Sequence, residues 1–540
     1  MPLTKVSSGT FLQHIIDNCI DHYRKFEEVY QLPSYTKLSD SVAPAVVCQI
    51  KSDVKKRIQS ENVKGFALVV DGSEVNHNSL INFCLVSANE SIFFKTIEVN
   101  DERKTELFLT DQFSKIIEEV GENQVNIVIS DGASNYLNAA MNQKNKFKHV
   151  RGIRCAIHAL NSFLKDICCQ ESCHNLPSIV TLLQKATTVS QFVLDKPFIR
   201  KLMKKLGSPK KLKRIAMTRF YTHFLVMERL LELYTQINNT LTHAEYTQWI
   251  NHSQQRHLRS KSSEVKQIVA DDEYWMHVKE FIDFLRPIIN LMLKLDSLTP
   301  IMGKLCRYLE IERQRQEIIN LSFISEGEKI LLRQRFEFRT YQIVSDFHQA
   351  AFCLDPEYRP IITKRNYLEH RNALYKLFED LYGLDKKPEL MHQWSMYISG
   401  MEEFEHKEVF LTASKMAAHD WWIAYGGQTE LAKLAVRLLS MVSSNSEAER
   451  NWSDFKVICT KERGRMSSQR ANDCVLVKHH VRGGRAPSRK FFDWQPAEEV
   501  VYVFEDDDLE VSDEDLEENE EDVVQVEEVN PDGEVVQVDP

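Results

Sequence analysis

Two aspartates each end a short apolar run and precede a glycine. Asp71 ends the run in FALVVDG, and Asp131 ends the run in VNIVISDG. A charged group is expensive to bury, so an acid at the end of an apolar strand needs a turn or a cation as its partner. Taken singly, each Asp-Gly pair is explained by a tight turn. Taken together, two carboxylates on paired strands repel each other, and a divalent cation relieves that repulsion.

The elements around these aspartates predict a mixed sheet. Apolar runs bounded by turn residues indicate strands at 65–72, 81–89, 91–99 and 124–132, and a short strand that begins the segment 150–169. Amphipathic spacing predicts helices over 105–121 and 133–147, and another after the last strand. Three sequential strands followed by crossover units imply a mixed sheet with helices on its faces. If the first and fourth strands pair, Asp71 and Asp131 lie side by side.

A candidate third acid lies far along the chain, in SSNSEAERNWSDF at 443–455. This stretch is typical of a helix start and carries Glu447 and Glu449, which a solvated first turn would explain because acids favour helix N-termini. An apolar stripe is expected along the helix, made of Ala448, Trp452, Phe455 and Cys459. The two glutamates flank this stripe on opposite sides, at about 100° each. Only one of them can face the sheet, and the local pattern does not choose between them.

Composition limits the class of protein. The chain has 540 residues, of which 43% are hydrophobic and 27% charged, as expected for a soluble globular protein with a large core. We expect no membrane span, because no apolar run reaches about 18 residues. We expect no signal peptide either, because no apolar stretch follows a basic start. The 11 scattered cysteines favour free thiols in a reducing compartment.

The net charge of −10 hides two opposite regions. Residues 505–539 contain 18 Asp and Glu and no Lys or Arg. The remaining 60 acids face 68 bases, so residues 1–504 carry about +8. An acidic segment poor in aromatic residues is expected to be disordered. A basic body with an acidic tail occurs in proteins that meet nucleic acid, and in many others.

The motifs together resemble the RNase H-like fold of cut-and-paste transposases, and most closely the hAT superfamily, in the group headed by a transposase-like domain of unknown function. Four segments carry the resemblance, over roughly residues 20–485: VVDGSEV, VISDGASNY, CAIHALN at 155–161, and SEAERNWSDF followed by TKERGRMSSQR. The resemblance implies that Glu449, directly before Arg-Asn-Trp-Ser, completes an Asp-Asp-Glu triad with Asp71 and Asp131. In that family the triad is catalytic and binds Mg²⁺ (or Mn²⁺) for DNA strand cleavage and transfer.

The resemblance also implies the fold class and domain order. We expect an α/β protein with an RNase H-like mixed sheet flanked by helices and a large all-helical insertion. The expected segments are an N-terminal helical segment (1–60), the first part of the core (61–170), the helical insertion (171–391), the C-terminal part of the core with the hAT dimerisation region (392–485), and an acidic disordered tail (486–540). The expected partners are DNA and a second copy of the chain, and the expected location is the nucleus.

Several basic residues are candidates for DNA contact. His158 follows Cys155 in the Cys-x-x-His motif, where the resemblance places it facing DNA; a core histidine or half of a zinc site would also explain it. Residues 200–220 carry nine Lys or Arg. Phosphate contact is expected from Lys210, Lys211, Lys213 and Arg214, although a solvated helix face explains such a run equally. Arg219 and Phe220 resemble a family motif in which the aromatic ring stacks on flipped bases.

Some features depart from the family. Members often begin with a zinc-binding finger, and here Cys19 and Cys48 lie too far apart to form one. Ser73 stands where a tryptophan often follows the first Asp. These departures favour an alternative, a transposon-derived, non-catalytic DNA-binding or dimerising interaction protein. We expect dimerisation around 430–485, because LAKLAVRLLSMV is apolar on most of its circumference, which a helix buried in the monomer would also explain.

Overall fold

The computed structural model describes residues 34–60, 64–75, 78–88, 90–99, 104–168, 175–213, 222–364, 367–459 and 466–482. Three of the DNA-contact candidates, Arg214, Arg219 and Phe220, lie outside these residues. The same holds for most of the N-terminal segment and for the acidic tail.

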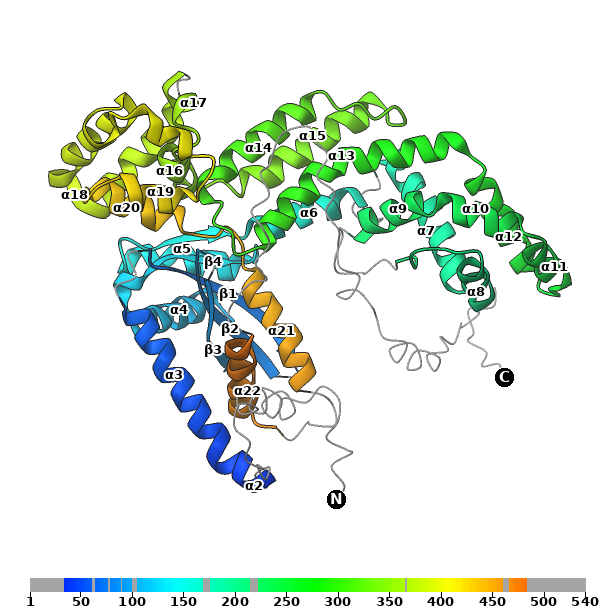
Figure 1. Ribbon diagram of the computed structural model, residues 1–540, viewed down its shortest axis with the longest axis horizontal. Coiled ribbons are helices and arrows are strands. Elements are labelled where there is room, and N and C mark those ends of the chain that lie inside the picture. The colour runs from blue at the N-terminus through cyan, green and yellow to red at the C-terminus, as the bar shows by residue number, and fades with distance from the viewer. Residues whose placement is uncertain are drawn as a thin grey trace, which may run out of the picture. The chain divides into compact units, whose positions relative to one another are not determined.

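The described part of the chain forms one five-stranded sheet in the order β3-β2-β1-β4-β5. Its strands are β1 (Phe66–Val75), β2 (Asn78–Ser87), β3 (Glu90–Val99), β4 (Val125–Ser130) and β5 (Arg151–Arg154). β1, β2 and β3 pair antiparallel, whereas β4 pairs parallel to both β1 and β5. This confirms the predicted α/β class with an RNase H-like mixed sheet (Figure 1).

Helices cover both faces of the sheet, which is why its central strands are apolar at nearly every position. One face packs against α4 (Glu106–Val120) and α5 (Ser134–Lys146) through Phe66, Leu68 and Val70 of β1. The other face packs against α21 (Ser446–Ile458) and α22 (Ser468–Val481) through residues such as Ala67 and Val69. α21 lies along β1 and β2, and α22 contacts β3 (Figure 1). The helix that carries the candidate glutamate is therefore part of the sheet's own core.

The first Asp-Gly pair does not form a turn. β1 continues through Gly72 to Val75, and Asp71 pairs with Asn82 of β2. The second pair does follow the end of a strand: Asp131 comes directly after β4, and its Oδ1 accepts a hydrogen bond from the Ala133 backbone N–H at 3.2 Å. The turn explanation therefore fails for Asp71 and holds for Asp131.

Helices make up the rest of the described chain. Before the sheet they are α2 (Tyr35–Lys37), a π-helical segment (Leu38–Val42) and α3 (Ala43–Gln59). A 3₁₀ turn (Glu122–Gln124) precedes β4, and α6 (Ala156–Cys168) follows β5. Then come α7 (Pro177–Leu194), α8 (Pro197–Lys205), α9 (Thr222–Glu232), α10 (Tyr234–Thr242), α11 (Ala244–His252), α12 (Arg256–Val269), α13 (Asp272–Asp296), α14 (Met302–Glu317), α15 (Glu326–Tyr341), α16 (Asp346–Leu354), α17 (Arg359–Lys364) and α18 (Leu368–Ser399). Two 3₁₀ segments (Glu402–Phe404, Lys407–Thr412), α19 (Ala418–Tyr425) and α20 (Glu430–Leu439) lead to α21.

These helices confirm the large helical part inserted between α6 and α21. None of the helices within the described residues is both long enough and apolar enough to cross a membrane.

The helix that suggested a dimer interface is covered by its own chain. α20 buries Leu431, Leu434, Val436 and Leu438, and it packs against α14, α16, α18 and α19. Its all-round apolar character is therefore explained by the monomer core. Dimerisation stays a prediction, and α20 no longer supports it.

Candidate functional site

Asp71 and Asp131 lie at the same edge of the sheet. β1 and β4 run parallel, and Val69 is the last β1 residue in register with β4, opposite Ile129. The chain therefore reaches Asp71 and Asp131 two residues beyond that pair, on neighbouring strands. The two side chains interact electrostatically, since the charge of Asp131 contributes to raising the pKa of Asp71.

Polar contacts hold the start of α21 against this edge. Asn82 of β2 donates from Nδ2 to the Ala448 carbonyl at 2.8 Å. One turn further along α21, Asn451 donates from Nδ2 to Cys84 Sγ at 2.9 Å. Just before the helix, the Ser443 carbonyl accepts from the Ala156 backbone N–H of α6 at 2.9 Å. These contacts join the helix to residues about 290–370 positions upstream and fix which of its side chains reach the sheet edge.

Trp452 contacts the first aspartate directly. Its Nε1–H donates to Asp71 Oδ2 at 2.6 Å. Sequence reasoning placed Trp452 only in the apolar stripe of α21 and missed this bond. One signal was present: Trp452 follows Glu449 by three residues, which puts the two side chains on neighbouring positions of one helix face.

His158 of α6 contacts the candidate glutamate. Its Nδ1 lies 3.3 Å from Glu449 Oε1 and 3.2 Å from Asn445 Oδ1. The His158 and Glu449 side chains are 35% and 43% exposed, so the pair stands at the surface of the site rather than inside the core. Cys155 is fully buried directly after β5, and its Sγ accepts from the Asn445 backbone N–H at 3.4 Å. The structure thus brings the Cys-x-x-His motif and α21 together.

The charges of these groups are strongly coupled. Burial, followed by the charge of Glu449, raises the pKa of Asp71 to about 7, although the bond from Trp452 and the charge of His158 oppose the rise. Burial by itself would lower the pKa of His158, but Cys155, Glu449 and Asp71 outweigh it and raise that pKa to about 10. Asp71 therefore titrates near neutral pH, where His158 is protonated.

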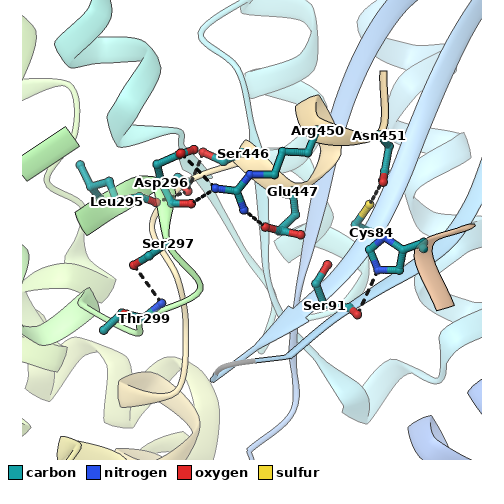
Figure 2. A network of polar contacts seen from close by, with 12 residues as sticks. Cys84, Ser91, Leu295, Asp296, Ser297, Thr299, Ser446, Glu447, Arg450 and Asn451 are labelled. Atoms are coloured by element: carbon teal, nitrogen blue, oxygen red, sulfur yellow. Dashed lines mark hydrogen bonds and ion pairs between the residues drawn. The ribbon is translucent and has the colours of Figure 1, made fainter. Parts of the chain in front are cut away.

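Glu447 belongs to a different network. It forms an ion pair with Arg450, which also binds Asp296 at 3.0 Å and the Asp296 carbonyl (Figure 2). The Glu447 side chain is 13% exposed, against 43% for Glu449. The charge of Glu447 acts to raise the pKa values of Cys84 and His479. For Asp71, Glu449 is the charged group that contributes most to the raised pKa. The geometry therefore selects Glu449 as the glutamate beside the aspartates.

The donor set suits a hard divalent cation, but the side chains are not arranged around one. Carboxylate oxygens are the ligands that Mg²⁺ prefers. Burial, followed by the charge of Glu449, raises the pKa of Asp71, and a bound cation would favour its charged form. Within the described residues, however, no three His, Cys, Asp or Glu side chains form a group that could hold a metal ion. Metal binding by Asp71, Asp131 and Glu449 stays a prediction.

The basic run lies in the helical part of the chain. Lys210 pairs with Glu232 at 3.3 Å, and the carbonyls of Lys211 and Lys213 accept hydrogen bonds from the Arg229 guanidinium and the Ser190 hydroxyl. The segment follows α8, which packs against α7 and α10. The role of these lysines in DNA binding, like that of Arg214, Arg219 and Phe220, stays a prediction.

Comparison with known proteins gives one match. Residues 33–189 match a domain of unknown function (DUF659), which is associated with hAT-type transposase-like proteins. No protein of curated function matches the chain. The matched residues include Asp71, Asp131 and His158, and they end within α7, before most of the helical part and before Glu449.

Proposed function

We propose that this protein is a hAT-type transposase-like protein that cleaves and joins DNA strands at Asp71, Asp131 and Glu449. The observation that carries the proposal is the convergence of these three acids. Asp71 lies in β1, Asp131 follows the neighbouring β4, and α21 brings the third acid to them across more than 300 residues. The Asp71 side chain is half-buried beside a second and a third acid, and burial and like charge raise its pKa to about 7, a shift typical of functional sites.

The three carboxylates would hold the divalent cations, which when bound would activate a water or a DNA 3′-hydroxyl and stabilise the leaving oxygen. The chain's own residues prepare the site. Trp452 holds one oxygen of Asp71, leaving the other free. His158 carries a positive charge next to Glu449 and thereby attracts the DNA phosphate. Because burial and like charge raise the pKa of Asp71 to about 7, cation binding at this residue would be accompanied by proton release near neutral pH.

Nicking of supercoiled plasmid by the purified protein tests the proposal, with Mg²⁺ or Mn²⁺ and with EDTA. Cation-dependent nicking that Asp71→Asn, Asp131→Asn and Glu449→Gln each abolish is the expected result. Glu447→Gln is the matched control, since it removes a charge two residues from Glu449 and outside the cluster. Absence of nicking in the unaltered protein, under conditions where it binds DNA, would overturn the proposal.

A second candidate is a DNA-binding protein that does not cut. It is favoured by the partners that the acids already have: Trp452 binds Asp71 and His158 binds Glu449, and no described group of side chains is shaped for a metal. In that case DNA affinity falls with rising salt, no nicking occurs, and Asp71→Asn leaves DNA affinity unchanged.

A further inference from the structure

The two glycines after the aspartates make room for polar side chains. A Cβ atom on Gly72 would overlap the Tyr136 hydroxyl and would lie 3.4 Å from Lys104 Nζ. A Cβ atom on Gly132 would overlap the Arg154 guanidinium. Neither glycine has a positive φ, so close approach and not backbone conformation accounts for both. Each aspartate of the site is thus followed by an open position that a hydrogen-bond donor fills.

Two of these donors lack a partner. The Tyr136 hydroxyl is buried and makes no hydrogen bond within the described part of the chain. Tyr136 is only 7% exposed, and its ring packs against Phe113 in the core, so the hydroxyl is held beside Gly72 of β1. Nε of Arg154 is likewise buried without a partner among the described residues, while its Nη1 donates to Gln342 Oε1 at 2.6 Å. Buried donors are almost always satisfied, so two orphans beside one site point to an absent acceptor.

Lys104 adds a cation to the same place. It is half-buried between β3 and α4, and its backbone carbonyl is held by Asn135 Nδ2 at 2.7 Å. Burial lowers the pKa of its ammonium, and the charges of Glu74, Asp71 and Asp131 act against that lowering. Among the described acids, none lies within ion-pair distance of the Lys104 ammonium. The carboxylates therefore attract the Lys104 ammonium electrostatically, but none of the described acids forms an ion pair with it.

We propose that Lys104, Tyr136 and Arg154 form a phosphate-binding rim over Gly72 and Gly132 that takes a phosphodiester oxyanion of the DNA strand next to the carboxylates. The inference rests on the proposed function and deepens it. A phosphate supplies the acceptor that the Tyr136 hydroxyl and Arg154 Nε lack, and the charge that Lys104 and Arg154 attract. Cations bound at Asp71 and Asp131 would neutralise the carboxylate charges that attract the Lys104 ammonium. The ammonium could then turn to the phosphate.

The test is the salt dependence of DNA affinity, measured by fluorescence anisotropy with Ca²⁺ in place of Mg²⁺. Lys104→Met and Arg154→Gln are each expected to lower affinity several-fold and to reduce the slope of log K against log salt by about 0.9, the value for one phosphate contact. Tyr136→Phe removes only the hydroxyl, so affinity falls about threefold and the slope is unchanged. Lys376→Met is the matched control, because Lys376 is exposed, pairs with Asp346 in the helical part, and is expected to change nothing.

The outcomes separate the two proposals. Unchanged slope and affinity in folded Lys104→Met and Tyr136→Phe proteins, with DNA binding by the unaltered protein, would overturn the rim and leave the proposed function standing. Absence of DNA binding by the unaltered protein would overturn both. A parallel titration with a deoxynucleoside triphosphate separates the sources of phosphate. If Lys104→Met weakens binding of the deoxynucleoside triphosphate and leaves DNA binding unchanged, the rim binds a free nucleotide and the proposal fails.

Discussion

Helix α21 carries two glutamates two residues apart, and their surroundings differ in kind. Glu447 lies in an ion-pair network, where Arg450 binds both Glu447 and Asp296. Glu449 lies in an acid cluster with Asp71 and Asp131, where burial and like charge raise the pKa of Asp71 to about 7. The ion-pair network stabilises the fold. The acid cluster costs stability and leaves a place for a cation or a substrate.

The largest expected effect tests the difference directly. Glu449→Gln should reduce Mg²⁺-dependent nicking by about 100-fold or more, because a carboxylate ligand is lost, whereas Glu447→Gln should change it by no more than about threefold. The measurement is the initial rate of plasmid nicking at equal protein concentration. Similar losses in both variants would mean that the two glutamates do not differ in function, and the comparison would fail.

The cost of the acid cluster can be measured as the pH dependence of the free energy of unfolding. The pKa of Asp71 is about 7 when folded and near 3.8 when unfolded. The folded state therefore keeps a proton that the unfolded state releases, and this group's contribution is lost as pH rises from about 4 to 7.

Asp71→Asn removes that titration. We expect it to stabilise the protein by about 1–3 kcal/mol at pH 8, a range discounted for partial exposure of the site, and by little at pH 4.5. Urea unfolding at the two pH values checks this. An equal effect at both would show that the charge of Asp71 carries no such cost.

Loss of a charge from the ion-pair network should instead destabilise the protein. Arg450→Met leaves the Glu447 side chain, which is 13% exposed, without its partner. We expect a loss of about 1–2 kcal/mol at pH 7, while Glu449→Gln stays within about 0.5 kcal/mol of the unaltered protein. Thermal unfolding of the two variants side by side decides this, and equal stabilities would remove the structural role assigned to Arg450.

The smallest effect concerns Trp452. Its hydrogen bond lowers the pKa of Asp71, so Trp452→Phe should move the pH midpoint of Mn²⁺ binding upward by about half a pH unit while preserving the packing of the ring. Electron paramagnetic resonance of free Mn²⁺ across pH 5–9 gives the midpoint. A downward movement would contradict the assigned direction.

Much of the sheet could be predicted from sequence because strand formation leaves a local record. The apolar runs placed all five strands, and β1 was wrong only in length, since Gly72 was taken as a turn residue. That error has a physical cause: the glycine serves the close approach of Tyr136, whose position depends on α5. Tyr136 was visible in the motif VISDGASNY, but nothing local indicated that its hydroxyl would reach β1.

The sequence by itself determined the alternation of strands and helices, the aspartates that end β1's apolar run and follow β4, and the pair of glutamates from which one had to be chosen. These depend on residue type and on periods of two and 3.6 residues, which act over short distances along the chain. Only the tertiary structure decided that Glu449 faces Asp71, that Arg450 binds Asp296, that Trp452 holds Asp71, and that α20 is covered by its own chain. The first three outcomes depend on contacts between segments 100 or more residues apart, as does the bond of Asn82 to Ala448, and no local pattern records which distant side chain will be there.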